Sequence, residues 1–241
     1  EIDLLIGGPP CQGHSNLNNH TRRDDVRNRL YYVMPAMAVA LDIPVVVIEN
    51  VRHIMRAHED VVGNTKKIFS THGYNCEEII LHAVDYGVAQ TRQRHFLIAS
   101  KKDAPLNISG IAESLKTDTL TYNNINGKLK KLGYKHSLLE SVPEYSEDNL
   151  MRMEALIGEG HRDLPLYLRP DCHKDGTTYK SVYGKIDPNA PASTITTGFV
   201  SPGRGRYTHP TKPRTINIRE AARIQSFPDW YWDVEPDMQL L

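Results

Sequence analysis

The chain has 241 residues, of which 39% are hydrophobic and 24% are charged, as is ordinary for a globular protein with a real core. Lys plus Arg and Asp plus Glu both number 29, so overall charge does not point to a nucleic-acid partner. The longest apolar run, Ile43 to Ile48, is too short to span a bilayer, and no export signal is visible, so we expect no membrane contact and a cytoplasmic location. Three widely spaced cysteines argue against a disulfide framework, and no ligand pairs stand at zinc-site spacing.

The first fifty residues predict a strand, a helix and a second strand. Ile2 to Ile6 and Pro44 to Ile48 are continuous apolar runs, and apolar residues recur at helical spacing between Leu30 and Leu41. Strands that are apolar throughout indicate a parallel sheet covered on both faces. A polar stretch from Gln12 to Asn28 lacks periodicity and is long for a compact domain, which is typical of a functional loop.

The pattern of predicted strands and helices continues to about residue 100 and is less regular after it. We expect a helix over 61–72 and strands over 75–83 and 95–100. Beyond Lys101 the segments are polar and rich in proline and asparagine, which predicts a separate irregular region. A short helix from Ile218 to Gln225, ended by Pro228, closes the pattern.

Cys11 is the first candidate for chemistry. A buried, unreactive thiol is the default interpretation of a cysteine. Cys11, however, follows the carboxyl end of a predicted parallel strand, where open α/β sheets place their active sites. Pro9 and Pro10 restrict the backbone before it, so we favour a functional thiol.

Two more groups of residues belong to the same edge of the sheet. Glu49 ends the second strand, either as a helix cap or, beside a reactive cysteine, as a proton donor. Gln90, Arg92 and Arg94 alternate onto one face; they either protect an edge strand or orient an anionic or carbonyl-bearing substrate.

Basic residues gather in two places. His20 to Arg29 holds four arginines against two aspartates, and Val200 to Arg223 holds six basic residues against one acid. A solvated surface explains either cluster alone, although basic loops also suit DNA phosphates. The six are Arg204, Arg206, Lys212, Arg214, Arg219 and Arg223.

Four sequence blocks in register resemble the DNA (cytosine-5)-methyltransferases, with bacterial members most similar. The blocks are GGPPCQGHS, VIENV, DYGVAQTRQRHFLIA and REAARIQSFPD, and the similarity covers roughly residues 1–100 and 178–230. The resemblance implies an α/β fold: the catalytic half of a Rossmann-like, S-adenosylmethionine-dependent methyltransferase sheet, with a small irregular target-recognition region. It implies domains at 1–102 (catalytic), 103–190 (target recognition) and 191–241 (a return segment).

The resemblance also implies a mechanism. Cys11 would add to C6 of cytosine, which makes C5 nucleophilic toward a methyl group. Glu49 would donate a hydrogen bond or proton to N3, which requires a raised pKa. Arg94 would contact the base or hold Cys11 and Glu49, and Arg92 would assist.

Double-stranded DNA is the partner that the resemblance implies, with the target cytosine turned out of the stack. The loop after Cys11 resembles the family's mobile catalytic loop. The residues expected at DNA are Gln12, Ser15, Arg22, Arg23, Gln90, Arg204 and Arg206. Lys128, Lys130 and Lys131 either bind phosphate or form a solvated surface.

S-adenosylmethionine is the expected cofactor, but its pocket is incomplete in the sequence. Pro10, Leu30 and Asn50 match cofactor-flanking positions, whereas the family's glycine-rich turn and closing asparagine block have no counterpart. We therefore expect a fragment of a methyltransferase, or one chain of a split enzyme completed by a partner or a missing N-terminal segment. The alternative is a catalytically incomplete DNA-binding or regulatory subunit. In each case, the strand over Ile2 to Ile6 should have an exposed pairing edge.

Overall fold

The computed structural model describes residues 2–10, 26–56, 60–101, 107–127, 137–174 and 181–232. The chain divides into two compact units, which are considered separately: Glu1–His82 with Gln93–Lys116, and Ala83–Arg92 with Thr117–Leu241. No helix within the described ranges is both long and apolar enough to cross a membrane.

The first unit contains a four-stranded mixed sheet with the strand order β1-β2-β4-β3. β1 (Leu4–Gly7) pairs in parallel with β2 (Val45–Val51), as the strand–helix–strand pattern predicts. β4 (Gln93–Ser100) is antiparallel to both of its neighbours, β2 and β3 (Asn75–His82). The sheet is therefore not parallel throughout, because β4 inserts between β2 and β3 in the opposite direction.

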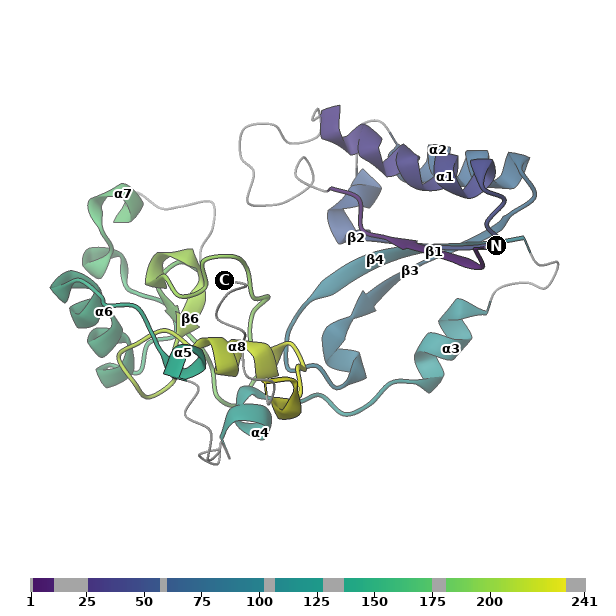
Figure 1. The fold of residues 1–241 in the computed structure, drawn as a ribbon. Coiled ribbons are helices and arrows are strands. Elements are labelled where there is room, and N and C mark those ends of the chain that lie inside the picture. Colours follow the sequence, from purple (N-terminus) through teal and green to yellow (C-terminus); the bar gives the residue numbers. More distant parts are fainter. Residues whose placement is uncertain are drawn as a thin grey trace. The chain divides into compact units, whose positions relative to one another are not determined.

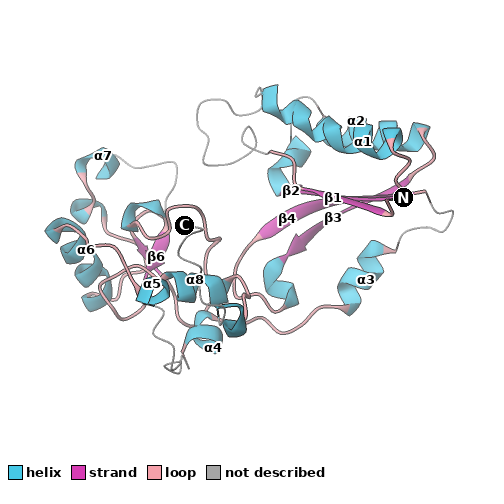
Figure 2. Ribbon diagram, viewed as in Figure 1, coloured by secondary structure: helices cyan, strands magenta, loops and turns pink. Residues whose placement is uncertain are grey.

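Two helices cover one face of this sheet (Figure 1; Figure 2). α1 (Val33–Ala40) follows a 3-10 turn at Val26–Tyr32, and α2 (Val61–Thr71) begins after Asp60, whose side chain accepts a hydrogen bond from the Gly63 amide. Alternation along the strands directs apolar side chains at this helical layer. The resulting core includes Tyr31, Val46, Ile48, Phe69 and Leu97.

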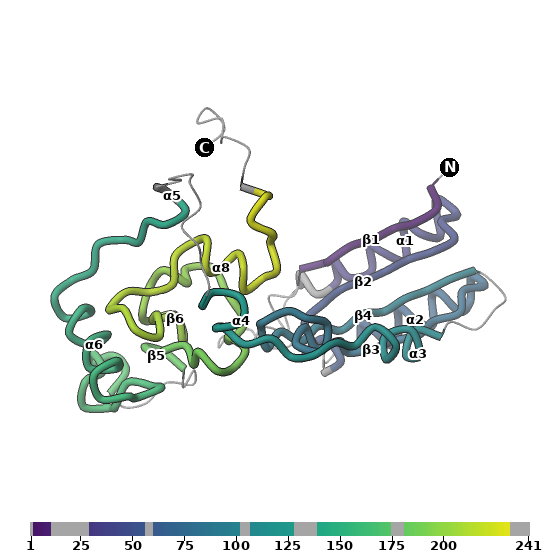
Figure 3. Tube along the Cα trace, turned by 90° about the horizontal axis from the view of Figure 1, so that it is seen from below, coloured from purple at the N-terminus to yellow at the C-terminus, as the bar shows by residue number. Residues whose placement is uncertain are grey.

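The opposite face is only partly covered. α3 (Ile108–Ser114) lies beside β3, where the Glu77 carboxylate accepts hydrogen bonds from the Ile108 and Ser109 amides, both at 3.0 Å. β1 lies at the opposite edge of the sheet from β3 (Figure 3), and its residues Leu4 and Ile6 remain 47% and 67% exposed. The expectation of a sheet covered on both faces is thus wrong for the described residues. Within them β1 pairs on one side only, as predicted.

The second unit is built from short elements around a small core. Its last helix, α8 (Ile218–Ile224), confirms the helix predicted there and contacts α4 and α5. The core contains Tyr122, Ile186, Tyr207, Ile216 and Ile224. The region expected to be irregular therefore includes ordered short helices, and residues 191–232 belong to the same compact unit. The other elements are α4 (Tyr122–Asn126), α5 (Ser137–Glu140), α6 (Glu147–Gly158), α7 (Asp171–Lys174), β5 (Gly184–Lys185) and β6 (Arg206–Thr208).

Gly7 provides a test of the packing of α1 on β1. A Cβ atom at Gly7 would lie 2.4 Å from the Met34 sulfur, whereas one at Gly8 would meet its nearest atom at 3.4 Å. We expect Gly7→Ala to lower the free energy of unfolding by about 0.5–1.5 kcal/mol, because the flexible end of the buried Met34 side chain must move away from its present rotamer. Urea denaturation would measure the change. Gly8→Ala is the control, and a smaller loss in Gly7→Ala than in Gly8→Ala would contradict the packing argument.

Candidate active site

The ends of β1 and β2 lie side by side. Gly7 is opposite Ile48 in the parallel register, so the next residues, Gly8 and Glu49, are neighbours. A Cβ atom on Gly8 would stand 3.4 Å from Oε2 of Glu49. The Gly8–Pro10 segment, which leads to Cys11, therefore begins beside Glu49 on the neighbouring strand. Cys11 itself lies outside the described residues.

Glu49 forms an ion pair with Arg94. Arg94 Nε lies 2.8 Å from Glu49 Oε1, and the two side chains are 21% and 35% exposed, respectively. Arg94 is opposite Val51 in the antiparallel register, so Arg94 and Glu49 project from the same face of the sheet. Arg94 Nη1 also donates to the carbonyl of Gln93 at 2.8 Å, which fixes the guanidinium further. The structure brings these two predicted residues together on two different strands.

Asn50 points to the other face and is 2% exposed. Its Nδ2 donates to the Pro9 carbonyl at 3.1 Å, and its Oδ1 accepts from the Val51 amide at 2.8 Å. These two bonds engage both ends of the carboxamide. The side chain is therefore buried and bonded to the segment before Cys11, and the expected position of Asn50 beside the cofactor stays a prediction.

Pro10 and Leu30 remain compatible with a cofactor contact. Both are exposed, and both lie where the chain leaves the carboxyl end of β1 or approaches α1, at the edge where α/β sheets bind ligands. Exposed leucine and proline side chains are apolar, so contact with the flat, partly apolar surface of an adenine nucleoside would remove apolar surface from water. The two residues thus fit one wall of an S-adenosylmethionine site, and their role stays a prediction.

Gln90 and Arg92 belong to the second unit. Gln90 pairs with Ala192 through an isolated bridge and is only 1% exposed, so a direct DNA contact by its side chain is not supported. The bridge extends to Thr91, whose amide donates to the Ala192 carbonyl at 2.9 Å. The Arg92 carbonyl accepts from the Ala83 amide at 2.8 Å, and the role of its guanidinium stays a prediction.

Four predicted DNA contacts, Gln12, Ser15, Arg22 and Arg23, lie outside the described residues and remain predictions. Arg206 lies in β6 and forms a two-bond pair with Asp163 at 2.7 and 2.8 Å. This pair gives Arg206 a structural function that the sequence did not reveal. Arg204, at the end of the turn before β6, is exposed.

Most of the basic cluster over residues 200–223 is used inside the second unit. Besides Arg206, three of its arginines form ion pairs: Arg214 with Glu220, Arg219 with Glu140, and Arg223 with Asp229. Among the described residues no ion pair is found for Arg204 or Lys212. The described part of the cluster is therefore chiefly structural, since four of its six basic residues pair with acids.

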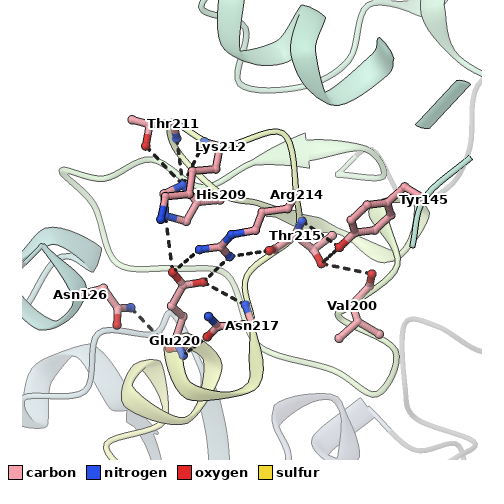
Figure 4. Close-up of polar contacts among 10 residues, drawn as sticks. All are labelled: Asn126, Tyr145, Val200, His209, Thr211, Lys212, Arg214, Thr215, Asn217 and Glu220. Atoms are coloured by element: carbon pink, nitrogen blue, oxygen red, sulfur yellow. Dashed lines mark hydrogen bonds and ion pairs between the residues drawn. The ribbon is translucent and has the colours of Figure 1, made fainter. Parts of the chain in front are cut away.

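A buried network around Glu220 organises this unit (Figure 4). Arg214 donates two hydrogen bonds to the Glu220 carboxylate at 2.7 and 2.8 Å. The Asn217 amide donates to Glu220 Oε2, and the Glu220 amide donates to Asn217 Oδ1, which caps α8 reciprocally. Burial alone would raise the pKa of Glu220, but the bonds from Arg214 and Asn217 outweigh it and lower that pKa. The spacing Asn217-x-x-Glu220 is the signal in the sequence that could have revealed this cap.

His209 joins the network as a neutral ring. Its Nδ1 accepts from the Thr211 and Lys212 amides at 3.0 and 3.2 Å, so the proton belongs on Nε2, which lies 3.5 Å from Glu220. Burial lowers the pKa of His209 to about 4, against the opposing effect of Glu220. The ring thereby holds the turn that carries Lys212.

The sequence comparisons identify the protein class that this fold and site define. The family C-5 cytosine-specific DNA methylase matches residues 1–239, and the chain belongs to that family.

Two curated relatives show how much of a longer protein the chain resembles. It is 39% identical over 233 residues to the type II methyltransferase M1.BsuMI of Bacillus subtilis, covering 96% of this chain and 54% of that protein. It is 28% identical to the type II methylase M.HgiDII of Herpetosiphon aurantiacus, covering 98% of this chain and 68% of that one. The chain thus spans about half the length of the first of these relatives.

Solved structures share the fold. An E. coli protein described as a DNA modification methyltransferase encoded within a prophage superposes with a TM-score of 0.64 at 24% identity, over 95% of this chain and 70% of that chain. The Dnmt2 methyltransferase of S. pombe gives a TM-score of 0.54 at 15% identity, over 94% and 66%. At these identities the likeness concerns the α/β architecture alone.

The neutral state of His209 makes stability depend on pH. Since the folded-state pKa is below that of the unfolded chain, the contribution of His209 is complete above about pH 6.5 and is lost as the pH falls toward 4. Between pH 7 and 5 we expect the free energy of unfolding of the wild type to fall by on the order of 1–2 kcal/mol more than that of His209→Asn. Asparagine keeps an acceptor near the Nδ1 position but does not titrate. Urea denaturation at pH 7, 6 and 5 measures both, and parallel profiles would exclude this role.

Proposed function

We propose that the protein methylates C5 of cytosine in duplex DNA, with S-adenosylmethionine as the methyl donor. The observation that carries the proposal is the Glu49–Arg94 pair, set beside the Gly8–Pro10 segment that leads to Cys11. Membership of the cytosine-specific DNA methylase family supports it. Because the DNA of a bacterial cell lies in the cytoplasm, that is where we expect the protein to act.

Cys11 is the proposed nucleophile. Its thiolate adds to C6 of cytosine, and the electron pair of the C5–C6 double bond shifts so that C5 becomes nucleophilic. After C5 has been methylated, a base removes the C5 proton, and elimination restores the double bond and releases the Cys11 thiolate. A carbon–sulfur bond thus forms and breaks once in each cycle.

Glu49 and Arg94 are proposed to activate the base. Glu49 would donate a hydrogen bond or proton at N3, which draws electron density from the ring and favours attack at C6. The guanidinium of Arg94, held by Glu49 Oε1 and the Gln93 carbonyl, fixes the orientation of the carboxyl group. Arg92 is proposed to assist from the neighbouring segment.

DNA binding requires the target base to leave the stack, because C6 is inaccessible within a duplex. We propose phosphate contacts by Arg22, Arg23 and Arg204, and contacts by Gln12 and Ser15 at the vacated position. The region over 103–190 is proposed to contribute target recognition. Lys212 joins the proposed phosphate contacts, because its side chain is exposed on a turn that His209 holds.

S-adenosylmethionine supplies an electrophilic methyl group when it is bound. Pro10 and Leu30 are the described residues that would hold part of it, at the carboxyl edge of the sheet. Asn50 is left out of this set, because both ends of its carboxamide are bonded within the protein.

Trapping the covalent intermediate tests the mechanism. Duplex DNA that contains 5-fluorocytosine is incubated with S-adenosylmethionine and the protein, both as this 241-residue chain and in its native full length. Fluorine at C5 blocks the final elimination, so we expect a denaturation-resistant adduct with the wild type and none with Cys11→Ser. We expect Glu49→Gln to slow the adduct about 10²–10⁴-fold, because the amide is not an acid and loses the ion pair with Arg94.

The controls separate binding from chemistry. DNA affinity of Cys11→Ser and Glu49→Gln should remain within a few-fold of the wild type. An adduct in the Cys11→Ser protein would refute the proposed nucleophile, and the absence of any adduct with the native full-length wild type would refute the activity. An adduct with the native full-length protein, but not with the 241-residue chain, would assign the activity to the whole protein and not to the chain by itself.

The two basic residues without an ion pair in the described part of the cluster offer a separate test of DNA binding. We expect Arg204→Ala and Lys212→Ala each to lower the slope of log K against log salt by about 1, because each contact releases about one counterion. Titration of a duplex at several salt concentrations measures this slope. Lys67→Ala, at an exposed lysine of α2 in the other unit, is the matched control. Equal effects in all three variants would indicate a general charge effect and not a local contact.

A further inference from the structure

The Asn50 side chain links β2 to the segment after β1, at the point where the backbone pairing of the two strands has ended. The backbone ladder between the two strands ends with Gly7 opposite Ile48, although β2 continues to Val51. Beyond that point Pro9 and Pro10 have no N–H group, so this segment cannot donate a backbone hydrogen bond to β2. The Asn50 side chain supplies a donor of its own and binds the Pro9 carbonyl at 3.1 Å.

The geometry of Asn50 is fixed at both ends of its carboxamide. Its Oδ1 accepts from the Val51 amide at 2.8 Å, which sets the direction in which Nδ2 points. The residue is 2% exposed, so water does not compete readily for either bond. Removal of the donor would leave a partly buried carbonyl without its partner, which is unfavourable because the carbonyl has lost its contact with water and gains no hydrogen bond in return.

We infer that Asn50 is a positioning residue for Cys11. It anchors the Pro9 carbonyl two residues before the thiol, and the ring of each proline restricts the intervening backbone to φ near −65°. A displaced reacting atom is costly: an error of about 1 Å can reduce a rate about 100-fold. The inference rests on the proposed function, since it takes Cys11 as the nucleophile. Asn50 acts through the Pro9–Pro10 backbone and touches no reacting atom.

Three variants separate this role from a general contribution to folding. Asn50→Leu removes both hydrogen bonds at similar volume. Asn50→Asp keeps the acceptor for the Val51 amide and loses the donor, except where the introduced carboxyl is protonated. Asn64→Leu is the matched control, since Asn64 on α2 donates a partly buried hydrogen bond to Tyr32 in the same unit.

The first measurement is the rate of adduct formation on 5-fluorocytosine DNA at saturating DNA, from pH 8.5 to pH 6. We expect Asn50→Leu to be slowed about 10–100-fold at every pH. Asn50→Asp should be slowed similarly at pH 8.5 and should approach the wild type toward pH 6. Burial raises the pKa of the introduced carboxyl, and its protonated form can again donate to the Pro9 carbonyl. DNA affinity and the Asn64→Leu rate should stay within about threefold of the wild type.

The second measurement is alkylation of Cys11 by iodoacetamide in the native full-length protein, followed by mass spectrometry of the Cys11 peptide. Half-buried Cys76 and exposed Cys172 report on folding in the same samples. We expect Asn50→Leu to change the pH profile of alkylation at Cys11 and to leave those of Cys76 and Cys172 as in the wild type. This readout needs no DNA and no methyl donor.

The outcomes decide between the possibilities. Wild-type rates in both Asn50 variants would overturn the inference, as would a slow Asn50→Asp that does not recover at low pH. Parallel losses of DNA affinity, or altered alkylation of Cys76, would assign Asn50 a purely structural role. If the wild type forms no adduct, the proposed function fails, and the alkylation profile alone then decides whether Asn50 controls the thiol.

Discussion

The parallel pairing of β1 with β2 is the constraint on which the site depends. Because both strands end at the same edge, Gly7 opposite Ile48 places the next two residues of each strand together. The Gly8–Pro10 segment therefore leaves the sheet beside Glu49. Gly7 is compatible with this arrangement because it has no side chain to displace Met34 of α1. The register between β1 and β2 thus places Gly7 against α1 and Gly8 beside Glu49.

Side chains alternate between the two faces of β2, so the consecutive residues Glu49 and Asn50 point to opposite faces of the sheet. Glu49 projects to the incompletely covered face, where Arg94 reaches it from β4. Asn50 projects into the helix-covered face and bonds to the Pro9 carbonyl. A reactive group needs access to a substrate, whereas a supporting hydrogen bond is stronger where water is excluded. Two adjacent positions on one strand satisfy both requirements.

The second unit shows why a count of charges is a weak guide to binding surfaces. Six basic residues between 200 and 223 suggest a phosphate-binding loop, but four of them pair with acidic side chains, two of which come from other segments. Asp163 and Glu140 are distant in sequence from Arg206 and Arg219, so no local pattern reveals these pairs. The buried Glu220 network likewise depends on segments that only folding brings together, apart from its capping-box spacing.

The sequence by itself determined the strand–helix–strand order, the late helix, expected over Ile218 to Gln225 and found over Ile218–Ile224, and the candidate roles of Cys11, Glu49 and Arg94. These follow from local periodicity, proline chemistry and family resemblance, which are properties of short segments. Only the tertiary structure decided that β4 inserts antiparallel between β2 and β3, that Gln90 is buried, and that the Asn50 side chain donates a hydrogen bond to the Pro9 carbonyl. Side-chain partners distant along the chain depend on register and burial, and these are set when the whole sheet forms.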